Sequence, residues 1–163
     1  MKKLRTQSCA LLCACALMAY SPNLMGQNSQ RANLEFSLRA LRAEPGKPSL
    51  YDLQFTTRDT LDPLAEMVFE FPREMDLRQL EIASSTSING GFKLSRAGNV
   101  VRVRRTGLGE TILPGKLVEL KLGLIISPPN LSANQEVAFE VRSAKGEVKL
   151  ARRRLAIQFL AVQ

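Results

Sequence analysis

The chain contains no histidine and no tryptophan, and its three cysteines, Cys9, Cys13 and Cys15, all lie among the first 15 of its 163 residues. Beyond residue 15 the sequence therefore excludes disulfides, thiol nucleophiles, cysteine-bound metals and histidine acid–base catalysis. It also offers no phosphate-binding glycine loop, because the segment 107–109 (GLG) lacks a third glycine and a following helical pattern. We expect no catalytic residue, no metal ligand and no cofactor.

Residues 1–26 have the pattern of an export signal. Three basic residues precede a short apolar run at 9–20 (CALLCACALMAY), and the small residue Gly26 follows. This order predicts a signal peptide cleaved after Gly26 and then a polar leader at 27–32, since the apolar run is too short for a membrane anchor. The alternative is a lipoprotein signal with lipid on Cys15, but there the apolar run before the cysteine is very short. We expect an exported protein, in the periplasm, on the cell surface or in the medium.

Residues 33–163 are expected to form one all-β domain. Short runs of alternating apolar and polar residues, typical of half-buried strands, are separated by turn residues. The apolar members of the clearest runs are Leu34, Phe36, Leu38, Tyr51, Leu53, Phe55, Met67, Phe69, Phe71, Val137, Phe139, Val141, Leu155, Ile157 and Phe159.

Two further segments sharpen the fold prediction. Residues 92–103 predict a β-hairpin around the turn at 97–99. The next strand is expected to point five apolar side chains toward the core: Val118, Leu120, Leu122, Leu124 and Ile126. We predict about eight to nine strands without a helix, in a single antiparallel β-sandwich or a flattened barrel.

The segment 51–129 follows a recognisable order of elements. A strand ends in FTT (55–57), the next strand closes on FEFP (69–72), and a later apolar strand starts at PG (114–115). This order resembles the immunoglobulin-like and cohesin-like β-sandwich modules of bacterial extracellular and surface proteins. The resemblance implies a spacer, an adhesive unit or a carbohydrate binder, and it transfers no ligand-binding residue.

Paired carboxylates are the remaining route to catalysis, since two acidic residues suffice for glycoside hydrolysis. The candidates lie in one loop and on the outward side of the following strand: Asp59, Asp62, Glu66, Glu70 and Glu74. Nothing around them predicts a cleft, and no calcium-loop spacing is present, so we interpret them as solvated surface charge. A carboxylate-based glycoside hydrolase is the least favoured function.

Charge is segregated along the chain. Residues 59–81 contain seven acids and two bases, whereas residues 82–109 contain five bases and residues 148–163 contain four, with no acid in either segment. Hairpin bases alternate with apolar positions and are expected to share the outer face of a sheet. The candidate ligand-binding residues are Lys93, Arg102, Arg104 and Arg153.

These patterns favour an exported, non-catalytic binding or adhesion module. Its basic sheet face would hold an acidic polysaccharide, an anionic envelope surface or the acidic face of a protein. Nucleic acid is not expected as a partner, because no exposed aromatics are interleaved with the bases. The structural alternative is a homo-oligomer in which the acidic segment of one copy meets the basic face of the next. Outward-facing charges also protect sheets from aggregation, and binding has to be tested against that ordinary role.

Overall fold

The computed structural model describes residues 36–131 and 134–160, and every regular element in these ranges is a strand. The strands are β1 (Phe36–Leu41), β2 (Pro48–Thr56), β3 (Glu66–Glu70), β4 (Ile82–Ser84), β5 (Phe92–Ala97), β6 (Val100–Arg105), β7 (Leu117–Ile126), β8 (Glu136–Arg142) and β9 (Val148–Leu160). The expected all-β fold of eight to nine strands is confirmed.

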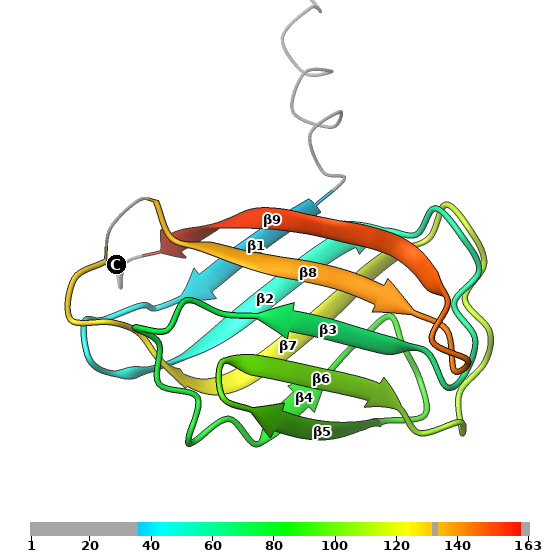
Figure 1. Cartoon of the computed structure of the whole chain (residues 1–163), viewed down its shortest axis with the longest axis horizontal. Coiled ribbons are helices and arrows are strands. Elements are labelled where there is room, and N and C mark those ends of the chain that lie inside the picture. The colour runs from blue at the N-terminus through cyan, green and yellow to red at the C-terminus, as the bar shows by residue number, and fades with distance from the viewer. Residues whose placement is uncertain (1–35, 132–133, 161–163) are drawn as a thin grey trace, which may run out of the picture.

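The strands are hydrogen-bonded in the order β4-β7-β2-β1-β9-β8-β3-β6-β5. Strand β9 belongs to both layers, because its end at Ile157–Leu160 runs parallel to β1 while its earlier residues pair antiparallel with β8. Figure 1 shows β9-β8-β3-β6-β5, called the front sheet below, lying over β4-β7-β2-β1, the back sheet. The predicted sandwich is confirmed, and β1 with β9 is the one parallel pair among the described strands.

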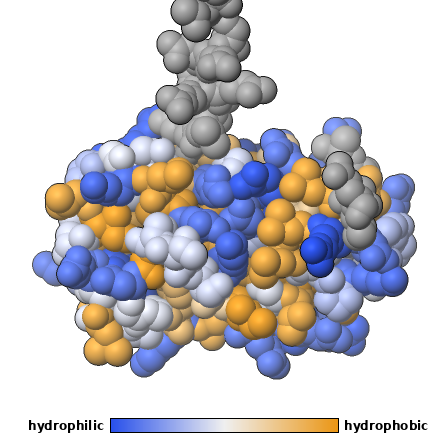
Figure 2. All heavy atoms as spheres, turned by 180° about the vertical axis from the view of Figure 1, so that it is seen from behind, coloured by the Kyte–Doolittle hydropathy of each residue, from blue (hydrophilic) through white to orange (hydrophobic). Residues whose placement is uncertain are grey.

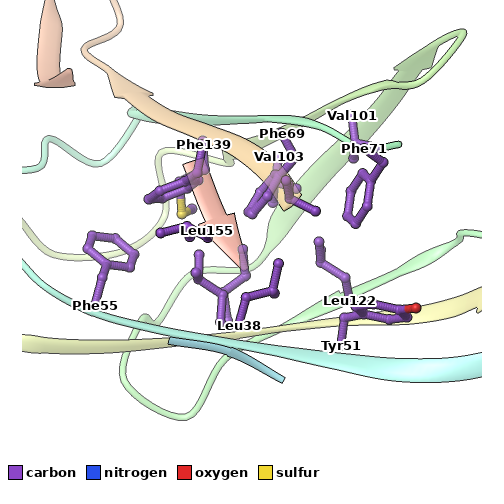
Figure 3. Close-up of a cluster of buried hydrophobic side chains, with 14 of the residues drawn as sticks. Leu38, Tyr51, Phe55, Phe69, Phe71, Val101, Val103, Leu122, Phe139 and Leu155 are labelled. Carbon is purple, nitrogen blue, oxygen red and sulfur yellow. The ribbon is translucent and has the colours of Figure 1, made fainter. Parts of the chain in front are cut away.

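Aromatic and aliphatic side chains of the two sheets meet between the layers (Figure 3). The ring of Phe139 in β8 lies 5.3 Å from Phe55 of β2 and 5.0 Å from Phe69 of β3, measured between centroids. All three rings are fully buried. Aromatic pairs in such geometry add to the stabilisation from burial itself. The core is therefore built where the alternating pattern of the sequence placed it.

Strand β7 departs from its predicted alternation near its end. Leu124 is 40% exposed, and Ile125 is buried in its place. The register with β2 shifts between Ser49 and Leu50, so that Leu124 becomes an extra, unpaired residue with φ of 69°. A β-bulge of this kind changes which residues beyond it face the core. The predictions that Leu124 and Ile126 point into the core are therefore wrong, since Ile126 is not among the core residues either.

The predicted signal peptide, the leader and the lipidation alternative at Cys15 lie outside the described residues. Within the ranges that the structure does describe, no helix has the length and apolar character needed to cross a membrane.

Candidate functional site

The outer surface of the front sheet carries the basic hairpin face predicted from the sequence. Lys93 of β5 lies opposite Arg104 of β6, which lies opposite Glu66 of β3, and Glu66 in turn lies opposite Arg142 of β8. Two residues along the same face, Ser95 of β5 lies opposite Arg102 of β6. All three hairpin bases are exposed, while the alternate residues Val101 and Val103 are fully buried. The structure thus brings Lys93, Arg102 and Arg104 together on one face.

Lys93 and Arg104 make no ion pair, although Glu66, which pairs with Arg102, lies opposite Arg104 on its other side. Both side chains are exposed, and neither makes an ion pair with any other residue that the structure describes. Like charges directly opposite each other on neighbouring strands destabilise a sheet. The pair therefore adds positive potential to the face without contributing to the fold.

The other bases of this face are neutralised by neighbouring acids. Arg102 Nη1 lies 3.3 Å from Glu66 Oε2, and Arg142 Nη2 lies 2.5 Å from Glu140 Oε1. Arg152 of β9 pairs in the same way with Glu70 of β3. Because β3 lies between β8 and β6, acids that cluster in the sequence are placed beside bases from other segments. Some of the charges that suggested head-to-tail assembly are thus paired within one copy, and the assembly itself stays a prediction.

A shallow hollow lies in the middle of this face. Its floor includes Val68 of β3, which is only 8% exposed although it points away from the core. The hollow is lined by Val68, Glu70, Val100, Arg102, Ala138, Glu140, Arg142 and Arg152. Small apolar residues form its centre and ion pairs form its walls, an arrangement suited to one apolar group surrounded by polar contacts.

Arg153 is separated from the other predicted site residues. It lies opposite the core residue Phe139 in the β8–β9 register, and its guanidinium carbon is 4.9 Å from the ring centroid of Phe36. A cation over an aromatic face is attracted by the ring quadrupole. Arg153 therefore covers the edge of the core near β1, and the structure does not bring it to the face with Lys93.

Four of the five acidic candidates for catalysis are held by basic side chains or main-chain amides, and the fifth, Glu74, is exposed and makes no ion pair with a described residue. Asp59 lies 3.4 Å from Lys149, and hydrogen bonds from the Thr60 amide and from Lys149 lower the pKa of Asp59. Asp62 accepts main-chain hydrogen bonds from Leu64 and Ala144. A general acid at neutral pH needs a raised pKa, so the neighbours of Asp59 act in the opposite direction. Across the described ranges, no three potential metal-ligating side chains come together.

Arg105 is the residue whose importance the sequence reasoning missed. It is 1% exposed, and its guanidinium donates hydrogen bonds to the main-chain oxygens of Leu61 at 3.2 Å, Asp62 at 2.8 Å and Glu110. Burial lowers the pKa of this guanidinium. The alternation that points Val103 inward also points Arg105 inward, so the signal was present in the sequence. Arg105 ties two loops together at one end of the sandwich.

The fold resembles cohesin modules and an immunoglobulin-like domain from bacteria and an archaeon, at low sequence identity. A cohesin module from a Clostridium perfringens family 33 glycoside hydrolase superposes with a TM-score of 0.45 at 19% identity, covering 77% of this chain and 95% of the module. A non-cellulosomal cohesin from Archaeoglobus fulgidus gives 0.44 at 11% identity, over 78% and 92%. An uncharacterised Nocardia farcinica protein with an immunoglobulin-like fold gives 0.45 at 14% identity, over 77% and 99%.

Neither a protein-family model nor the sequence of a curated protein matches the chain. The chain is thus similar in fold to cohesin modules and immunoglobulin-like domains, in agreement with the resemblance found in its sequence. At these identities and TM-scores, the similarity carries no function across.

Proposed function

We propose that this protein is a non-catalytic binding module whose front-sheet outer face holds an anionic partner. The observation that carries the proposal is the pair of exposed, unpaired bases Lys93 and Arg104, set directly opposite each other on β5 and β6. Repulsion between these two like charges slightly lowers the stability of the sheet. An anionic ligand placed across both strands would remove the repulsion and form charge-assisted hydrogen bonds. An acidic polysaccharide is the first candidate, because it presents carboxylates at regular spacing.

The test is binding of polygalacturonate and of neutral dextran at low and at high salt. The native protein is expected to bind polygalacturonate only, and high salt is expected to weaken that binding, because exposed charges are screened. The double variant K93E/R104E is expected to bind at least about tenfold more weakly, since two charge-assisted contacts become repulsive.

The matched control is K116E/K145E, which changes the net charge equally at two other exposed lysines without ion pairs among the described residues. It is expected to retain most of the binding. Equal losses in both double variants would mean that only net charge matters, and binding of dextran that survives high salt would contradict the proposal.

A second candidate partner is an acidic protein segment, favoured by the hollow at Val68. Protein interfaces are commonly anchored by one apolar side chain in a pocket with a polar rim. A glutamate-rich peptide with a central leucine is then expected to bind more tightly than the same peptide with a central serine. The uncharged substitution V68S should remove that difference, while polygalacturonate binding should persist. Equal affinities for the two peptides would exclude this candidate.

The proposal includes export through the signal predicted at residues 1–26. Protein recovered from its native cells is expected to begin at Gln27 when its N-terminus is sequenced. A mature chain that begins at a lipid-modified Cys15 would favour the lipoprotein alternative, and an intact Met1 would exclude both.

A further inference from the structure

One end of the sandwich concentrates exposed hydrophobic side chains. Eight large hydrophobic residues are exposed in the described part of the chain, and five of them lie at this end: Leu64, Leu108, Leu113, Leu117 and Val148. Figure 1 shows the loops that follow β2, β6 and β8 converging there, on the right. These five residues are called the loop-end patch below.

The loop that carries Leu108 is held firmly in place. Leu108 is 86% exposed, although its neighbours Gly107 and Gly109 lie in close main-chain contacts. A Cβ on Gly109 would come within 2.1 Å of the Asn89 main-chain oxygen, and the Asn89 side chain accepts a hydrogen bond from the Glu110 amide at 3.0 Å. The guanidinium of Arg105 also binds this loop through Glu110. The fold therefore keeps Leu108 in water.

The loops at this end are joined to one another. The Leu64 side chain lies against Gly107, where an added Cβ would come within 3.0 Å of Leu64 Cδ2. The main chain of Ile112 bridges to Leu61, which brings the segment with Leu113 alongside the loop with Leu64. A patch assembled from several loops is more informative than a single exposed leucine, because scattered exposed leucines are normal.

Two lysines flank the loop-end patch. Lys145 and Leu64 line one shallow hollow, while Lys116 lines a second hollow together with Leu113 and Leu117. Both lysines are exposed and make no ion pair with a described residue. At the same end, Lys149 forms ion pairs with the carboxylates of Asp59 and Glu147. The carboxylates of Asp62 and Glu110 make no ion pair with a described residue.

We propose that the loop-end patch inserts into the surface of an anionic lipid bilayer, with Lys116 and Lys145 at the level of the lipid phosphates. A bilayer interface offers an apolar phase for leucines directly beneath a layer of negative charge. An acidic polysaccharide offers the charge without the apolar phase, and so it does not account for the leucines. This inference goes beyond the proposed function and uses other residues.

The experiment uses the full chain with the substitution L108W, since the native sequence contains no tryptophan. Vesicles are made of phosphatidylcholine alone or with phosphatidylglycerol, both with brominated acyl chains. The indole fluorescence is expected to shift to shorter wavelength and to be quenched only by vesicles that contain phosphatidylglycerol. Fluorescence that neither vesicle changes would overturn the proposal.

The control variant is I82W, at an exposed position of β4 in the back sheet, 46% exposed. Figure 2 shows the surface of that sheet, where hydrophobic and hydrophilic residues are interspersed. The two variants share residues 1–35, so any adsorption through that segment affects both equally. An equal response from I82W would therefore also overturn the proposal.

Further variants distinguish the contribution of the lysine charges to vesicle binding from that of leucine insertion. In sedimentation with the same vesicles, L108E is expected to lower binding about tenfold, the loss that corresponds to one inserted leucine. K116E/K145E is expected to weaken binding by about an order of magnitude as well. Both variants should still bind polygalacturonate, whereas K93E/R104E should lose it and keep more vesicle binding than K116E/K145E. The opposite ranking would contradict the assignment, and each proposal can thus fail alone.

Discussion

At the scale of single residues, Arg105 shows how a charge can serve a structural purpose inside an apolar sandwich. Its guanidinium lies among main-chain carbonyls of the loops 57–65 and 106–116. An arginine has five N–H donors in a planar arrangement, so one side chain can donate hydrogen bonds to both loops at once. The conformation of both loops depends on this residue.

Replacing Arg105 by alanine is expected to lower the free energy of unfolding by about 3 kcal/mol, because three carbonyls lose a charged donor and a cavity remains. The stability of the Arg105→Lys variant should lie between those of the native protein and of Arg105→Ala, since lysine keeps the charge but has fewer donors. Urea unfolding followed by circular dichroism measures both. The neighbouring exposed residue gives the control, as Arg104→Ala should change stability by less than about 0.5 kcal/mol. Equal small effects at both positions would contradict the role assigned to Arg105.

Asp76 gives the clearest pH-dependent group. Hydrogen bonds from the side chain and main chain of Arg78 lower the pKa of Asp76 from its ordinary value of 3.8 to about 2. A lowered pKa in the folded state stabilises the fold above pH 3.8, and this contribution is lost as the pH falls toward 2. Its size is small, because both groups are exposed to solvent.

Arg78→Gln is expected to raise the pKa of Asp76 part of the way to 3.8, because the main-chain amide of residue 78 still donates its hydrogen bond. A pH titration of the carboxyl carbon by NMR measures the change. An unaltered titration in the variant would show that the guanidinium does not set this pKa.

At the scale of elements, the β5–β6 hairpin has a buried apolar inner face and an outer face with like charges opposite each other. The residues opposite one another across the front sheet are Lys93, Arg104, Glu66 and Arg142, so the charges alternate except at the first step. Changing Lys93 to glutamate would complete the alternation. At position 93, fold stability therefore favours an acidic residue, whereas binding of an anion requires a basic one.

K93E alone is expected to raise the free energy of unfolding by about 0.2–1 kcal/mol, the range of an opposite-charge cross-strand pair. The same variant should bind polygalacturonate more weakly than the native protein. Chemical unfolding and a binding titration on one preparation measure the two effects. A variant that is more stable and binds equally well would show that Lys93 is only a misplaced surface charge.

The elements also show which parts of the fold the sequence could reveal. The alternating pattern predicted the inner faces of β2, β3, β6 and β8 correctly, because the apolar residues at alternate positions of these strands are buried. It could not reveal the bulge in β7, since Leu124 and Ile125 are equally apolar and only the pairing with Leu50 decides which of them is buried. The same reasoning found the three hairpin bases from local pattern but grouped them with Arg153, whose position depends on the passage of β9 between the sheets.

At the scale of the whole molecule, folding rearranges the charge that the sequence separates. Glu66 and Glu70 of β3 pair with Arg102 of β6 and Arg152 of β9, so acids of the segment 59–81 are matched with bases from both basic segments. Strand order is a long-range property that local patterns do not contain. Lys93 and Arg104 on the front sheet and Lys116 and Lys145 at the loop end are among the exposed bases that make no ion pair with a described residue. These two places, one polar and one partly apolar, suit different partners.

The central claim is that the front-sheet face is the binding surface, and NMR of the ¹⁵N-labelled protein tests it most directly. Oligogalacturonate is added stepwise while the main-chain amide signals are followed. The signals of β5 and β6 around Lys93, Arg102 and Arg104 are expected to move most, with smaller changes in β3 and almost none in β2 and β7. Shifts centred on the back sheet, or shifts spread evenly over all exposed bases, would contradict the claim.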